Sequence, residues 1–284
     1  MTCVQETAFA KINLDLRVCR RRADGYHDLD SLVVFATIGD RLTFTPADQL
    51  SLEITGPFAA ALNETDDNLV LDAARALASM MDRRPTVRMT LEKNLPVAAG
   101  LGGGSADAAA TLRGLSRLWG TALDIADLMA MAKELGADVP ACIGSKPCRM
   151  QGIGERLLPI NYPEECPILL VNPKVAAPTP TVFRMLKSMS GERPSSLPVD
   201  DASRFHQALL QSVNDLQAPA MRLLPVIRDV LAMIDDQPGC KLARMSGSGA
   251  TCFGLFSDQT TVDRARAALL GMRPDWWVAA ASSR

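Results

Sequence analysis

The sequence predicts an α+β protein that is divided into two domains. Runs of alternating apolar and polar residues indicate strands, and longer runs with apolar residues at helical spacing indicate helices. The chain of 284 residues has the length of one large or two medium domains, and its hydrophobic content of 48% is enough for a substantial core. A proline-rich tract at residues 159–167 marks the candidate boundary. We therefore expect one domain at residues 1–160 and another at residues 161–284.

Alternation predicts the first strands of the chain. Residues 12–18 alternate apolar with polar side chains, as a half-buried strand does, and Lys11 stands at their start. A lysine there is usually a solvated strand end. Residues 32–36 are typical of another strand, and residues 42–44 and 50–54 suggest a meander.

Helical spacing predicts three helices in the middle of the first half. They are expected at residues 68–81, with Asn68 as the N-cap, at residues 105–119 and at residues 124–135. The pattern then breaks at residues 136–140, where Pro140 disfavours the α region for the residue before it. Asp138 is therefore expected in a short loop, either as a helix cap or as a carboxylate beside a buried ligand.

The second half of the chain mixes strands with helices. We expect strands at residues 168–171 and 276–280, helices at residues 178–183, 204–212, 218–234 and 260–270, and a polar, proline-rich surface loop at residues 188–203. Pro225 is expected to kink or restart the helix in which it lies. A second glycine-rich turn, at residues 246–250, lies between two apolar runs. It suits either a simple hairpin or a backbone that closes over phosphate.

The most informative stretch is residues 96–110, in which four glycines lie within five positions. It follows an apolar strand and leads into an alanine-rich helix. Glycine permits a positive φ, which we expect at Gly103, and it lets a ligand approach the backbone closely. The first N–H groups of a helix have no partner inside it and favour an anion. The stretch is therefore predicted to cradle phosphate, with a flexible linker as the alternative.

Two well-known phosphate loops do not fit this stretch. A Walker A loop has a lysine after its last glycine, and no lysine lies between Gly100 and Leu112. The dinucleotide fingerprint has a glycine at the position of Ser105.

Two further positions have open interpretations. Tyr26 and His27 lie in a turn that is either an ordinary surface loop or a place where a planar ligand is stacked and hydrogen-bonded. Lys93 precedes the glycine loop, either as a solvated turn residue or as a contact to phosphate or nucleotide.

Composition excludes several classes of function. The net charge of −2 gives no indication of nucleic-acid binding, and two histidines argue against a histidine-based zinc site. No apolar stretch reaches the roughly 18 residues of a membrane span, and the N-terminus lacks a signal-peptide pattern. Seven scattered cysteines without a Cys-x-x-Cys motif indicate free thiols. We expect a cytoplasmic protein without membrane or nucleic-acid partners, as a monomer or weak homodimer.

Three stretches together resemble the GHMP kinase superfamily. They are residues 10–14 (Ala-Lys-Ile-Asn-Leu), residues 96–108, which are similar to the family's Pro-x-x-x-Gly-Leu-Gly-x-Ser-Ser/Ala loop, and residues 244–251, which are similar to its C-terminal Gly-Ser-Gly loop. The resemblance therefore covers nearly the whole chain. It implies an N-terminal ribosomal-protein-like domain with a left-handed β-α-β crossover and a C-terminal ferredoxin-like domain.

Four motifs resemble one branch of that superfamily, which phosphorylates a cytidyl-linked sugar alcohol. They are residues 10–14, Gly-Tyr-His at 25–27, Leu-Gly-Ala-Asp-Val-Pro at 135–140 and Pro-Thr-Pro-x-x-Phe at 178–183. The resemblance implies transfer of the γ-phosphate of ATP, with Mg²⁺, to the 2-hydroxyl of a methylerythritol group. It places that reaction in the non-mevalonate route to isoprenoid precursors.

The same resemblance implies roles for individual residues. The ATP phosphates would rest on Pro96, Val97, Ala98, Ala99, Gly100, Leu101, Gly102, Gly103, Gly104, Ser105 and Ala106. Ser105 would offer its hydroxyl to phosphate or Mg²⁺, and Asn68 and Lys93 resemble contacts on the adenosine side. Tyr26 and Phe183 resemble residues that stack on the cytosine, His27 its edge contact, and Asn13 and Thr179 nearby polar contacts.

The chemistry itself requires a base and a cation. A hydroxyl is a poor nucleophile at neutral pH, so a positioned carboxylate such as Asp138 is expected to take its proton. A neighbouring cation, for which Lys11 is the candidate, would lower the pKa of that carboxyl group and orient the attacking oxygen. The alternatives are a homoserine or mevalonate kinase of the same superfamily, which needs no cytosine site, and a nucleotide-binding module without catalysis.

Overall fold

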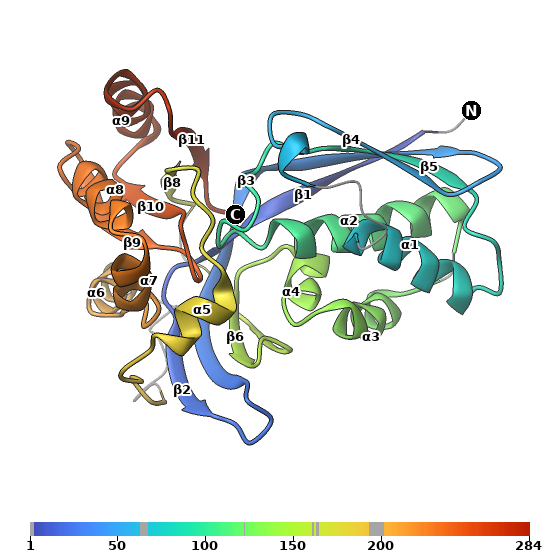
Figure 1. Ribbon diagram of the computed structural model, residues 1–284, viewed down its shortest axis with the longest axis horizontal. Coiled ribbons are helices and arrows are strands. Elements are labelled where there is room, and N and C mark those ends of the chain that lie inside the picture. The colour runs from blue at the N-terminus through green and yellow to red at the C-terminus, as the bar shows by residue number, and fades with distance from the viewer. Residues whose placement is uncertain (1–2, 63–67, 122, 161, 163–164, 193–201) are drawn as a thin grey trace. The chain divides into compact units, whose positions relative to one another are not determined.

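The computed structural model describes residues 3–62, 68–121, 123–160, 162, 165–192 and 202–284 (Figure 1). The chain forms two compact units that interleave along the sequence. One combines the N-terminal segment ending at Ala10 with Ile38–Val97 and Gly102–Ser145. The other combines Lys11–Thr37, Ala98–Leu101 and Lys146–Arg284. The two units are defined by contacts in space, and each contains several separate segments of the sequence. The expected domain boundary at residue 160 therefore stays a prediction.

The first unit joins strands to a layer of helices. Its elements are most of β1 (Val4–Asn13), the second half of β3 (His27–Pro46), β4 (Ser51–Thr55), a short 3₁₀ helix (Ala59–Ala61), α1 (Leu69–Met80), β5 (Val87–Glu92), α2 (Gly103–Trp119), α3 (Ile125–Leu135) and α4 (Val139–Gly144). β5 pairs antiparallel with β3 and parallel with β4. α1 therefore connects two parallel neighbours, which is the β-α-β crossover that the family resemblance predicts. Figure 1 shows α1 to α4 grouped beside these strands.

Small residues bring α2 close to the strands. Its alanines at 106 and 108–110 are buried, and a Cβ at Gly114 would lie 2.2 Å from the ring of Phe44. Only glycine allows this approach, because real side chains do not tolerate such a distance. The helix that carries the glycine loop is thus fixed closely against β3.

The second unit contains a four-stranded antiparallel sheet. In it, β8 (Pro167–Asn172) lies between β11 (Trp277–Ser282) and β10 (Cys252–Phe256), and β9 (Cys240–Met245) forms the edge beside β10. The helices of this unit are α5 (Thr179–Arg184), α6 (Ala202–Leu210), α7 (Gln217–Leu223), α8 (Val226–Asp235) and α9 (Gln259–Met272). α8 packs on β9 and β10, and α9 packs on β8 and β11. This βα-ββ-αβ order is the ferredoxin-like arrangement that was expected.

The first half of β3 pairs with further strands of this unit. β2 (Arg17–Arg21) and β6 (Cys148–Gly152) each pair antiparallel with it, and β7 (Arg156–Pro159) pairs with β6. In the described part of the chain no helix is long and apolar enough to cross a membrane.

Several elements differ from the sequence prediction. Residues 12–18 are not one half-buried strand, because β1 ends at Asn13 and Asp15 is fully buried. The carboxylate of Asp15 accepts the N–H of Leu32 at 2.7 Å, which explains why a polar residue of the alternation is inside. The meander is wrong as well. Residues 32–36 and 42–44 belong to the single strand β3, and β4 pairs parallel with β5 instead.

Helix boundaries agree more closely. Asn68 caps α1 by accepting the N–H of Val70, and Pro225 restarts the chain into α8, as predicted. α2 begins at Gly103, two residues before the expected start. Of the loop predicted at residues 188–203, residues 193–201 lie outside the described part of the chain.

Candidate active site

The backbone of the glycine loop alternates in handedness. Ala98, Gly100 and Gly102 have φ values of 51°, 75° and 63°, and the residues between them have negative φ. Such alternation forms a concave nest of N–H groups that suits an anion. The positive φ expected at Gly103 is wrong, because this residue already lies in the first turn of α2.

The two sides of the loop differ in their hydrogen bonds. The carbonyl oxygens of Ala99, Gly100 and Leu101 accept hydrogen bonds from Thr251 N–H (3.1 Å), Ser246 Oγ (2.9 Å) and Lys11 N–H (2.9 Å). Within the described chain, the N–H groups of residues 98–102 donate none. The loop therefore presents uncommitted donors, which fits the phosphates of a nucleotide.

The start of α2 continues this arrangement. Its N-cap, Gly102, has no side chain to satisfy the first-turn N–H groups, and Ser105 is half-buried in that turn. No group of three or more metal-ligating side chains gathers among the described residues. The role of Ser105 as a ligand of Mg²⁺ stays a prediction.

A buried ionic cluster, which the sequence did not predict, lies under this turn. The ammonium group of Lys93 lies 2.5 Å from Asp40 Oδ2 and 2.7 Å from Asp107 Oδ2. Burial raises the pKa of Asp107 to about 7, against the opposing charge of Lys93. Burial lowers the pKa of Lys93, but the two carboxylates outweigh it and the net shift is upward. In the sequence, the position of Asp107 in an alanine-rich stretch was a sign of a buried carboxylate. No comparable pattern marks Asp40.

The end of β1 presents a polar pair. Lys11 is 3% exposed, and its Nζ donates to Asn13 Oδ1 at 3.3 Å. Asn13 Nδ2 donates to Ser31 Oγ at 2.7 Å, and the N–H of Asn13 donates to Ser246 Oγ at 3.1 Å. Ser246 thus bonds both β1 and the glycine loop. The second glycine turn is the hairpin between β9 and β10, and its residue Ser246 holds the glycine loop through the carbonyl oxygen of Gly100.

Aromatic rings gather near the β2–β3 turn. The rings of His27 and Phe183 stack with their centroids 4.9 Å apart and their planes at 26°. Burial, and then the charge of Arg21, lower the pKa of His27. Tyr26, which precedes His27 in the sequence, is 62% exposed. Thr179 bonds the hydroxyl of Ser248 at 2.8 Å, which connects α5 to the second glycine turn.

Asp138 occupies the N-cap position of α4 without a side-chain capping bond. The capping interpretation is therefore wrong. The predicted break after residue 135 is confirmed, because α3 ends there. The expectation that Pro140 keeps Val139 out of the α region is wrong, because α4 begins at Val139 with the proline in its first turn, where its missing N–H costs nothing.

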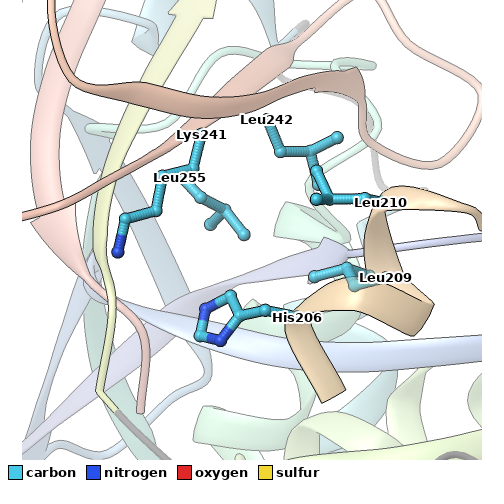
Figure 2. Close-up of a pocket in the computed structure, with 6 residues that line it drawn as sticks. All are labelled: His206, Leu209, Leu210, Lys241, Leu242 and Leu255. Atoms are coloured by element: carbon cyan, nitrogen blue, oxygen red, sulfur yellow. The ribbon is translucent and has the colours of Figure 1, made fainter. Parts of the chain in front are cut away.

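One hollow contains none of the predicted site residues. It has a volume of about 390 Å³ and is lined by His206, Leu209 and Leu210 of α6, Lys241 and Leu242 of β9 and Leu255 of β10 (Figure 2).

Comparison with known proteins identifies the family. Residues 68–146 match the model of the GHMP kinases N terminal domain, and residues 196–272 match that of the GHMP kinases C terminal domain. The chain belongs to the GHMP kinase family. It is therefore an ATP-dependent kinase of a small molecule.

Individual relatives extend the similarity of this GHMP kinase to nearly the whole chain. The 4-diphosphocytidyl-2-C-methyl-D-erythritol kinase of Rhodospirillum rubrum is 53% identical over 98% of this chain and 91% of the relative. That of Gluconacetobacter diazotrophicus is 51% identical over 97% and 93%. A crystal structure of 4-(cytidine 5'-diphospho)-2C-methyl-D-erythritol kinase superimposes with a TM-score of 0.82 at 33% identity, covering 98% of each chain.

A more distant solved structure shares the architecture. Homoserine kinase from Cytophaga hutchinsonii has a TM-score of 0.73 at 16% identity, over 100% of this chain and 95% of its own. This likeness shows the fold alone.

Proposed function

We propose that this GHMP kinase transfers the γ-phosphate of ATP to the 2-hydroxyl of 4-diphosphocytidyl-2-C-methyl-D-erythritol. The observation that carries the proposal is the stacked pair of His27 and Phe183, with the exposed Tyr26 next to His27 in the sequence, which suits a planar base. Two relatives with about half of their residues identical to this chain bear the name of that activity.

On the nucleotide side, the loop of residues 96–106 holds the phosphates. Its alternating φ values and uncommitted N–H groups supply donors, and the N-terminus of α2 adds a favourable dipole. The Ser105 hydroxyl would help to hold Mg²⁺, which would neutralise part of the triphosphate charge. Asn68 and Lys93 act on the adenosine side.

On the acceptor side, Tyr26 and Phe183 stack on the cytosine and His27 bonds its edge. The neutral imidazole has one donor and one acceptor nitrogen, and the lowered pKa of His27 favours this form at pH 7. Asn13 and Thr179 supply polar contacts to the same substrate, and their amide and hydroxyl groups suit that role.

Asp138 takes the proton of the 2-hydroxyl as the oxygen attacks the γ-phosphorus. The carboxylate is half-buried and is the only one in the stretch of residues 136–140, which supports this role. The ammonium group of Lys11 serves as the cation that orients the attacking oxygen. ADP leaves as the new phosphate ester forms, so the residues position the reactants and stabilise charge.

Three broader assignments complete the proposal. The domain of residues 1–160 binds ATP, and that of residues 161–284 contributes to the substrate site. The seven cysteines are scattered and form no Cys-x-x-Cys motif, which supports a reducing cytoplasm. The protein acts as a monomer or weak homodimer without nucleic-acid or membrane partners.

A turnover assay with a panel of alcohols tests this function. ADP release is measured with ATP, Mg²⁺ and either the cytidyl compound, homoserine or mevalonate. We expect turnover with the cytidyl compound alone. Preference for homoserine or mevalonate would contradict the proposed substrate, and binding of ATP without any turnover would identify a non-catalytic module.

A further inference from the structure

Two members of the buried cluster of Asp40, Lys93 and Asp107, the aspartates, have no part in the reaction as derived above. The three side chains of the cluster are at most 4% exposed. Lys93 lies shortly before the glycine loop of residues 96–106, and Asp107 lies one turn into the helix that follows it. The cluster therefore joins the two ends of the loop, and we name it the loop clasp.

Asp40 extends the clasp to the backbone. While its Oδ2 binds Lys93, its Oδ1 accepts the N–H groups of Asn94 at 2.6 Å and Leu95 at 2.8 Å. A Cβ at Gly103 would lie 3.3 Å from Lys93 Nζ, so the ammonium stands against the first turn of α2. The Asp40 carboxylate thus fixes the segment before the loop, and the Asp107 carboxylate fixes the start of the helix after it.

The clasp is a poor device for stability alone. It contains two carboxylates and one ammonium, and Asp107 Oδ1 is buried without a hydrogen-bond partner. Removing such groups from water is costly, and apolar residues of similar volume often stabilise a fold equally well or better. Unlike apolar contacts, the charged hydrogen bonds of the clasp are directional, so they fix the geometry of both ends of the loop.

We propose that Asp40 and Asp107 are positioning residues for nucleotide binding, which hold Lys93 and both ends of the glycine loop so that its N–H groups are preset for phosphate. This inference rests on the proposed function, because it takes the loop as the nucleotide site. A preset loop loses less freedom on binding, so the clasp acts on nucleotide affinity.

The test compares Asp107→Ala and Asp107→Asn with a matched control, Thr111→Val. Thr111 is fully buried one turn further along α2, and its hydroxyl donates to the carbonyl of Asp107, so the control removes a buried polar group without opening the clasp. Calorimetry measures the Kd of the Mg²⁺ complex of a non-hydrolysable ATP analogue. Steady-state kinetics measures KM for the cytidyl acceptor, and thermal melting measures stability.

We expect Asp107→Ala to raise the Kd roughly tenfold, the effect of losing one hydrogen bond between charged groups. Asp107→Asn keeps an oxygen for Lys93 and should raise it about threefold, and Thr111→Val should change it less than about twofold. The acceptor KM should stay unchanged in all three.

Wild-type affinity in the Asp107 variants, with or without a lower melting temperature, would overturn the inference and leave ATP binding intact. If Asp107→Ala does not fold, the isosteric Asp107→Asn decides by the same criterion. Absence of binding by the wild type would instead overturn the proposed nucleotide site itself.

Discussion

Replacement of Tyr26 by alanine separates ligand recognition from packing. The side chain of Tyr26 is 62% exposed, and the hydrogen bonds of its residue are made by the backbone. Its N–H donates to Asp24 Oδ1 at 3.1 Å, and its carbonyl accepts from Arg22 N–H at 2.8 Å. Alanine keeps both bonds, so the free energy of unfolding should change by no more than about 0.5 kcal/mol.

The expected effect on the substrate is much larger. Stacking of an aromatic side chain on a base contributes roughly 1–3 kcal/mol. At 1.4 kcal/mol per decade, Tyr26→Ala should raise KM for the cytidyl substrate about 10- to 100-fold. The KM for ATP should stay within about twofold, because the aromatic group does not belong to the phosphate loop.

The chain offers a matched control in its only other tyrosine. The half-buried ring of Tyr162 meets that of buried Phe205 edge-on, with centroids 5.5 Å apart. Tyr162→Ala should therefore lower the melting temperature and leave both KM values unchanged. An unchanged cytidyl KM in Tyr26→Ala, or an equal rise in both KM values with a lower melting temperature, would refute the stacking argument.

Three further predictions concern the reaction and its pH dependence. Asp138→Asn should lower kcat by about 10²–10⁴-fold while calorimetry still detects ATP binding, and a near-normal kcat would exclude Asp138 as the base. Gly103→Val should weaken ATP binding, because a branched side chain would press on the Lys93 ammonium, whose Nζ lies 3.3 Å from a Cβ placed there; unchanged affinity in a folded variant would count against the cradle. Burial, then the charge of Arg21, lower the pKa of His27 from 6.5, so the cytidyl KM should be constant above that pH and rise as the pH falls below it. A rise that begins above pH 6.5 would contradict the neutral His27 contact.

Much of the fold follows from local signals in the sequence. The cap at Asn68, the restart at Pro225 and the glycine loop ahead of α2 each depend on a short stretch of chain. The burial of Asp15 could not be predicted, because its partner Leu32 is supplied by another strand. Alternation alone also gave no sign that β3 continues through 20 residues.

The candidate site divides in the same way. Lys11, Asn13 and the phosphate loop stand in recognisable motifs, and the structure adds their hydrogen bonds. The loop clasp could not be found from spacing, because Asp40 and Asp107 are 67 positions apart in the sequence and both bind Lys93 only in the folded protein. Ser246 likewise reaches Gly100 across a long separation in sequence.

A competition assay tests the central claim most directly. Equal concentrations of 4-diphosphocytidyl-2-C-methyl-D-erythritol and free 2-C-methyl-D-erythritol are incubated with the enzyme, ATP and Mg²⁺, and phosphorus NMR identifies which alcohol carries the new phosphate and at which oxygen. The cytosine site predicts that the cytidyl compound is phosphorylated at its 2-hydroxyl and that the free alcohol is left unmodified. Comparable phosphorylation of both alcohols, or phosphate on a different oxygen of the cytidyl compound, would contradict it.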